Sequence, residues 1–391
     1  MATRTLRGVE EQGATFVELF FDLVFVFAVT QITGVLAHDL TAGGVVRALI
    51  VFWLVWWAWT QFTWSLNEAD TEHPGIRLTT LVATALAFVM AMTVPDVAQE
   101  TGWLFPLSYL IVRVVGIALQ WMLVEDDAQW STAVRRWTMV SSVGLIAVAV
   151  AVVVPPEHRF VALGVAALLD VFAALRAATQ GEWRLFSGHF AERHGLFVII
   201  ALGESLIAAG VTAGGQPRTA GLLGVTVIAV VAACALWWTY FGWVMGALEE
   251  SLAGQGPATV GRTARDVYSF AHFPVIAGVI GFAVAIEESV AHPRDALETP
   301  AVIALVVGVG LFLGGVAVAL RLARCRVPPL RLGALGLLVV STPLLMAMPA
   351  WAALATVAGV VVALAIVERP MGRHAGPAAT EGASAGDAAT G

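Results

Sequence analysis

Two acidic residues in the first apolar segment are the clearest candidates for chemistry. Glu18 and Asp22 are four residues apart, so a helix places both on one face. A charge near the centre of a bilayer costs about 2.5 to 3.5 kcal/mol and therefore needs a partner, a water-filled cavity or a function. Two carboxyl groups this close in a poorly hydrated site favour a bound proton near neutral pH. In the structural alternative, Glu18 lies at the membrane interface and Asp22 accepts one hydrogen bond from another helix.

Further polar residues lie within later apolar segments. Glu204 has no opposite charge within one helical turn, and the hydroxyl of Ser205 follows it. Tyr268 and His272 are four residues apart on one helical face, just before Pro274, where a helix bends or loosens. With the two acids of the first segment, these residues are our candidates for a proton, ion or substrate site. A structural hydrogen bond is the alternative for Glu204.

Two clusters of histidine and acidic residues lie at the ends of apolar segments. The first contains Asn67 and Asp70, and the second contains Glu192, Arg193 and His194. Neither shows a metal-ligand pattern such as two histidines flanking a glutamate, so we expect no metal and no cofactor. We interpret the clusters as a cytoplasmic gate between two halves of the protein. A solvated loop is the alternative.

One arginine and one aspartate lie well inside apolar segments. Arg113 and Asp170 each follow the outer end of their segment by about ten residues, which places them at equal depth. A structural charge pair between two helices is the favoured interpretation, and a transport role is the alternative.

The elements that position these residues are predicted to be membrane-spanning helices. The chain has 391 residues, of which 59% are hydrophobic and 13% charged, whereas a soluble domain carries about 25% charged residues. A bilayer core requires roughly 20 apolar residues per helix. We therefore predict an all-α integral membrane protein with about twelve transmembrane helices. They are expected at 16–37, 45–66, 78–95, 103–124, 137–154, 160–178, 195–212, 220–245, 268–287, 301–320, 330–348 and 350–367.

The distribution of arginine predicts the orientation in the plasma membrane. With twelve spans, 16 of the 21 arginines fall on the side of the N-terminus, four fall on the opposite side, and Arg113 lies within a span. Cytoplasmic loops collect basic residues, so both termini are expected in the cytoplasm. Residues 1–15 would be a cytoplasmic segment, 16–370 the membrane domain and 371–391 a disordered tail. Residues 330–367 would form two spans or one re-entrant hairpin.

The two halves of the membrane domain resemble each other. The stretch TFVELFFDLVFVFAVTQ opens the first span and HFAERHGLFVIIALGES the seventh, and the following spans end in WWAWTQFTW and WWTYFGW. An offset of six spans preserves orientation, so residues 16–178 and 189–367 would form two parallel six-helix repeats. Chance similarity between apolar helices is the alternative.

Several function classes are excluded by composition. All 21 basic residues are arginine, so no lysine is present for a Schiff base or for a phosphate-binding loop. The net charge of −7 without basic clusters argues against nucleic acid as a partner. Membrane lipids and an unknown small molecule remain the expected partners.

Five motifs together resemble the bacterial low temperature requirement protein A family, whose name refers to growth in the cold. They are ELFFDLVFVFAVTQ (18–31), TWSLNEADTE (63–72), ERHGLFVIIALGES (192–205), WWTYF (237–241) and YSFAHFP (268–274). The resemblance implies a bacterial multi-pass membrane protein and supplies no catalytic residues. It covers about 260 residues and leaves the last three helices supported by hydropathy alone.

The function that these features favour is secondary transport of an unknown small solute, coupled to protons or ions. The first rival is a membrane-embedded enzyme that acts on a lipid or isoprenoid, with Asp22 or Glu204 as general acid. The second is a structural or sensory membrane protein of cold adaptation. A non-enzymatic role is favoured over an enzymatic one.

Overall fold

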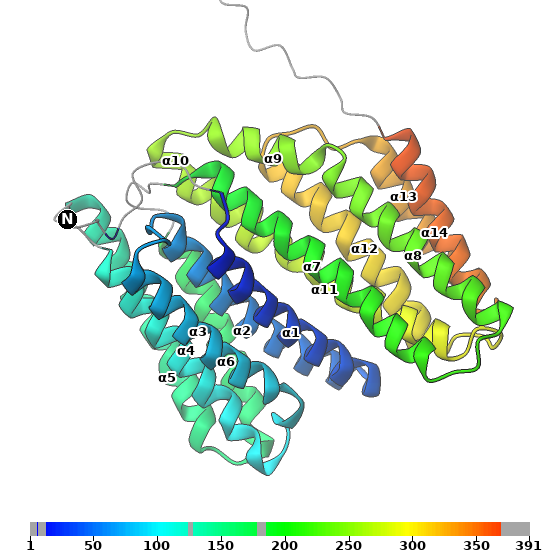
Figure 1. Ribbon diagram of the computed structural model, residues 1–391, viewed down its shortest axis with the longest axis horizontal. Helices are drawn as coiled ribbons and strands as arrows, with labels where there is room; N and C mark the ends of the chain where they lie inside the picture. Colours follow the sequence, from blue (N-terminus) through cyan, green and yellow to red (C-terminus); the bar gives the residue numbers. More distant parts are fainter. Residues whose placement is uncertain (1–5, 7–12, 124–127, 178–184, 369–391) are drawn as a thin grey trace, which may run out of the picture.

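The computed structural model describes residue 6 and residues 13–123, 128–177 and 185–368, and these residues form an all-helical fold (Figure 1). The predicted tail, 371–391, and most of the predicted N-terminal segment lie outside the described residues. The first helices are α1 (Phe16–His38), α2 (Ala42–Asn67), α3 (Pro74–Met92), α4 (Leu104–Met122), α5 (Ala128–Val153) and α6 (Pro156–Ala177). The later ones are α7 (Ser187–Gly214), α8 (Ala220–Phe241), α9 (Val244–Ala253), α10 (Pro257–Thr263), α11 (His272–Ala291), α12 (Thr299–Leu322), α13 (Pro329–Leu345) and α14 (Ala350–Val367).

Ten helices of at least 18 residues are long and apolar enough to cross a membrane, counted over the described residues. Two shorter apolar helices, Trp137–Val153 and Pro329–Leu345, occupy the places of the fifth and eleventh predicted spans. The prediction of many apolar spanning helices is therefore confirmed, and the total of twelve stays a prediction. Helices are the required form here because lipid offers no hydrogen-bond partner to an exposed backbone.

The helices form two groups that lie side by side. Helices α1–α6 pack together as the first group, coloured blue to green, and α7–α14 pack as the second, coloured green to red (Figure 1). The groups meet where α1 packs against α7 and α11, and where α2 packs against the same two helices. Residues on α1, α2, α7 and α11 therefore line the contact between the groups.

The predicted polar connector at about residues 245–267 is itself helical. It contains α9 and α10 and leads into a π-helix, Ala264–Phe270, which continues into α11. A π-helix places one extra residue in a turn and is frequent at functional sites. This segment shifts the orientation of Tyr268 and Ser269 relative to a continuous α-helix. Apolar periodicity does not reveal such a local change, so the prediction of a plain span from 268 missed it.

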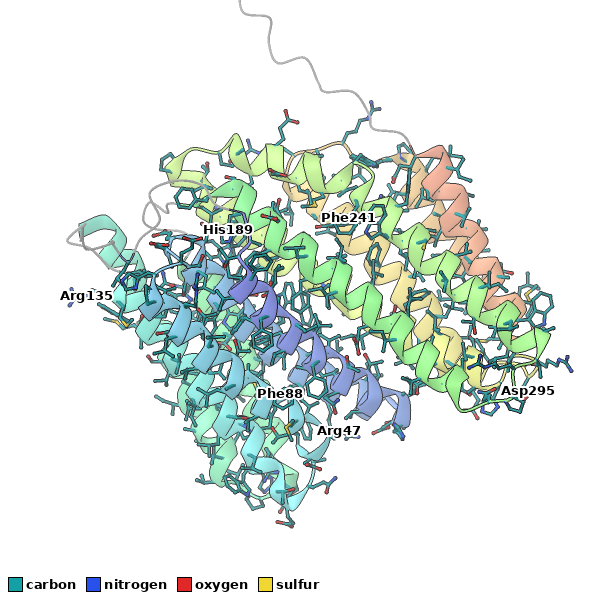
Figure 2. All side chains as sticks on the ribbon, viewed as in Figure 1. Arg47, Phe88, Arg135, His189, Phe241 and Asp295 are labelled. Atoms are coloured by element: carbon teal, nitrogen blue, oxygen red, sulfur yellow. The ribbon has the colours of Figure 1, made fainter. Side chains whose placement is uncertain are left out.

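The bundle has two ends that are easily followed in the figures. Helices α1 and α7 both begin at one end, which we call the near end, and His189 marks it (Figure 2). Arg47 at the start of α2 and Asp295 before α12 mark the opposite end, which we call the far end (Figure 2).

Candidate functional site

An ion network joins the two helix groups near the near end. Arg193 on α7 lies between the two carboxylates of α1: its Nη1 is 3.2 Å from Glu18 Oε1, and its Nε is 3.3 Å from Asp22 Oδ2. Arg193 Nη2 also donates to Asp22 Oδ1. All three side chains are fully buried. The acids were expected to share one helical face, but the arginine that pairs with them was expected in the gate.

Three neighbours hold this network in place. Trp59 on α2 donates from Nε1 to Asp22 Oδ1 at 2.7 Å, so all of α1, α2 and α7 contribute. His189 Nε2 lies 3.1 Å from Glu18 Oε1. Glu18 also closes the first turn of α1, because its Oε2 accepts from the backbone N–H of Thr15 at 3.0 Å. Glu18 thus stabilises a helix terminus and an ion pair together.

The network carries more negative than positive groups. Glu18 and Asp22 supply two carboxylates, and Arg193 supplies one guanidinium. With His189 neutral, the formal charge is −1, and one added proton makes it zero. An unbalanced charge in a fully buried site is costly, so the arrangement is suited to bind one proton.

A second buried polar cluster lies beside the network in the second helix group. The rings of Tyr268 and His272 are stacked at 5.2 Å between centroids, and the His194 ring lies 5.1 Å from that of Tyr268. Tyr240 OH and His272 Nε2 are 2.7 Å apart. His194 was expected in the gate, but it belongs to this cluster with the predicted pair Tyr268 and His272. Trp59 touches both sites, because its ring lies 4.9 Å from that of His194.

The other predicted gate residues lie at the near end in separate contacts. Asn67 donates from Nδ2 to the carbonyl of Phe186 at 3.0 Å and contacts His189 Nδ1 at 3.2 Å. Glu192 Oε2 accepts from the backbone N–H of Ala14 at 2.9 Å. Asp70 is buried, and its Oδ1 accepts from the backbone N–H two residues later. Asn67 therefore reaches the ion network through His189.

Glu204 and Ser205 do not join Asp22. Ser205 donates to the carbonyl of Leu202 in its own helix at 2.7 Å. Glu204 instead lines a groove of about 670 Å³ toward the far end, together with Glu287 on α11 and polar residues of α1. Asp39 at the rim of this groove has a pKa below its usual range, mainly because the Thr41 hydroxyl donates to it. The groove is therefore acidic.

Arg113 and Asp170 form a fully buried ion pair within the first helix group. Arg113 Nη1 lies 3.2 Å from Asp170 Oδ2, and the same nitrogen donates to Tyr109 OH. The pair connects α4 with α6, away from the contact between the two groups.

Neutralising Arg113 alone or Asp170 alone should destabilise the protein by about 3 to 5 kcal/mol, because the remaining charge stays buried without its partner. Exchanging the two residues should recover much of this loss. Thermal unfolding of the purified variants in detergent measures both effects. Equal damage from the single and the exchanged variants would show that the two charges do not act as a pair.

Sequence reasoning did not select several residues that the structure places in these clusters. They are Trp59, His189, Tyr240 and Glu287. His189 and Tyr240 adjoin recognised motifs, which is a weak signal. Among the described residues, no group of three or more histidine, cysteine, aspartate or glutamate side chains has a geometry for a metal ion.

Comparison with known proteins extends the resemblance seen in the motifs. A model of the family described as bacterial low temperature requirement A protein matches residues 13–366. The uncharacterized protein RA0937 of Rhizobium meliloti (strain 1021) is 30% identical over 322 residues, which cover 79% of this chain and 77% of the relative. No solved structure matches. The family match includes the last helices, which the motifs alone did not reach.

Proposed function

Because this chain belongs to the bacterial low temperature requirement A family, we propose that it is a proton-coupled secondary transporter of a small solute in the plasma membrane. The observation that carries the proposal is the buried network of Glu18, Asp22 and Arg193 at the contact between the two helix groups. It needs one proton for neutrality, and it lies where the groups would move against each other during transport.

Access from both ends of the bundle supports a transport cycle. From the near end, His189 connects Asn67 with the ion network, so a proton has a hydrogen-bonded route inward. From the far end, the acidic groove reaches Glu204, well inside α7. In alternating access, a solute enters from one of these sides while the other is closed, and the proton bound at the network favours one of the two states.

The packing order of the helices supports two parallel repeats. In the first group α1 packs on α2 and α3, α3 on α4, α4 on α5, α5 on α6, and α6 on α2. In the second group α7 packs on α8 and α11, α11 on α12, α12 on α13, α13 on α14, and α14 on α8. The two sequences of contacts correspond when α9 and α10 are treated as an insertion. We therefore include twelve spans in two six-helix repeats in the proposal.

Solute-dependent proton movement tests this function. The purified protein would be reconstituted into liposomes that contain a pH indicator, and solutes from a chemically diverse panel would be added outside. We expect at least one solute to move protons across the membrane in wild-type vesicles and in none of the protein-free vesicles. Solute uptake that proceeds at the same rate when a protonophore collapses the pH gradient would contradict proton coupling.

The proposed orientation has its own test, because the chain contains no lysine. The N-terminal amine is then the one primary amine that an amine reagent can label. We place it in the cytoplasm, where a membrane-impermeant reagent does not reach it, so intact cells should show no labelling and lysed cells should show strong labelling. Strong labelling in intact cells would reverse the orientation.

A further inference from the structure

A cavity of about 60 Å³ lies between the two helix groups, apart from the ion network and the acidic groove. Its walls come from both groups, with α2, α4, α5 and α6 on one side and the segment from α10 into the π-helix on the other. One water molecule needs roughly 10 to 15 Å³ of such space, so the cavity accommodates something larger than one water. Three indole rings line it, those of Trp57, Trp64 and Trp137.

The side chain of Gln61 gives this cavity a specific hydrogen-bonding character. Gln61 is 3% exposed and lines the cavity, and its Nε2 donates to the carbonyl of Arg113 at 3.1 Å. A carbonyl accepts from an N–H and not from another carbonyl, so this contact fixes the orientation of the amide. Gln61 Oε1 is then a buried acceptor with no hydrogen-bond partner among the described residues.

The neighbouring helix holds the Gln61 amide in that position. A Cβ atom added at Gly116 on α4 would lie 2.5 Å from Gln61 Nε2, so a glycine is required for the amide to pack against this helix. A buried acceptor that is held rigidly and left without a donor costs about 1 to 3 kcal/mol. The cost is offset when a bound molecule supplies the donor.

The charges around the cavity define what kind of molecule fits. Arg265 is the one charged side chain in its described lining, and it is paired with Asp266, which lies 2.6 Å from Arg265 Nη2. No carboxylate lines the cavity to attract a cation, and the paired guanidinium offers little to an anion. Flat indole faces favour stacking with a planar ring.

We propose that this cavity is a binding site for a small, uncharged, planar molecule that donates one N–H or O–H hydrogen bond to Gln61 Oε1. The ring of the ligand packs among the three tryptophans, and its donor satisfies the buried amide oxygen. Binding at this site does not require proton coupling, so it stands or falls separately from the proposed transport function.

Two matched probes test the site: benzimidazole, which has one N–H donor when uncharged, and 1-methylbenzimidazole, which has none. Both would be titrated calorimetrically into the full-length protein in detergent at mildly alkaline pH, with detergent alone as blank. We expect benzimidazole to bind roughly ten-fold more tightly or better, because only it satisfies Gln61. Equal affinities of the two probes, or no saturable binding of benzimidazole up to about millimolar concentration, would overturn the proposal.

Two variants locate the binding. Gln61→Leu removes the acceptor and should abolish the preference between the probes. Trp137→Leu removes a stacking surface and should weaken both probes by a similar factor, roughly five-fold. The control is Trp351→Leu on α14, far along the chain from the cavity and 48% exposed, which should change neither affinity. If Gln61→Leu does not yield folded protein, the probe pair on wild type and Trp137→Leu still decides.

Two further outcomes separate this site from its rivals. Asp22→Asn should bind both probes as wild type does, because Asp22 lies in the ion network and not in the cavity. Tighter binding of phenyltrimethylammonium than of benzimidazole would overturn the assignment of an uncharged ligand and identify a cation site. Unchanged affinity in Trp137→Leu would place the binding elsewhere on the protein.

Discussion

Arg193→Met is expected to destabilise the protein by at least about 3 to 5 kcal/mol, which is the usual cost of removing one partner from a buried ion pair. The cost should lie at or above the upper end, because Arg193 is the guanidinium shared by Glu18 and Asp22. Its loss leaves two carboxylates in a fully buried site. Thermal and denaturant unfolding in detergent would measure the effect, with the yield of purified protein as a second readout.

The charge explanation has a specific rescue. Combining Arg193→Met with Glu18→Gln and Asp22→Asn removes all three formal charges, so this triple variant should be clearly more stable than Arg193→Met alone. The matched control is Arg47→Met, because Arg47 forms an ion pair with Asp39 while 43% of its side chain is exposed. That variant should leave the unfolding midpoint nearly unchanged. A triple variant no more stable than Arg193→Met would show that packing, not charge, sets the cost.

Much of the fold was predictable because membrane insertion imposes a simple rule. Long apolar runs must be helical in lipid, and the predicted first span, 16–37, agrees with α1, Phe16–His38, to one residue. The predicted span at 268–287 was less accurate, because hydropathy does not distinguish an α-helix from the π-helix Ala264–Phe270 that precedes α11. The helices α9 and α10 were missed for a related reason: they are short and too polar to register as spans.

The candidate site was predictable in its residue types but not in its pairings. Glu18 and Asp22 were recognisable because acids are rare and costly within apolar helices. Arg193 was assigned to a gate because it lies near the start of α7, beside Glu192 and His194. Its contact with α1 depends on how α1 packs against α7, which no local pattern encodes. Gln61 gave no signal at all, since its importance comes from an amide orientation fixed by α4.

Asp22→Asn should abolish solute-dependent proton movement in proteoliposomes while leaving the folded protein intact. The asparagine Oδ1 still accepts from Trp59 Nε1, and Arg193 keeps Glu18 as its counter-charge. The network then has no excess negative charge and no longer binds the extra proton. Because one carboxylate and one guanidinium remain balanced, stability should stay within about 1 kcal/mol of wild type or rise. A purely structural role for Asp22 predicts normal transport instead.

Glu204→Gln extends this test to the acidic groove. Glu204 lies within α7 and lines the groove with Glu287, so removing its charge should reduce transport without affecting the ion network. Glu157→Gln at the exposed start of α6 is the matched control and should transport as wild type does. Proton movement and growth in the cold should both be measured, beside thermal unfolding, for each variant and for the double variant Asp22→Asn, Glu204→Gln. Wild-type transport and growth in that double variant would contradict proton-coupled transport through these carboxylates.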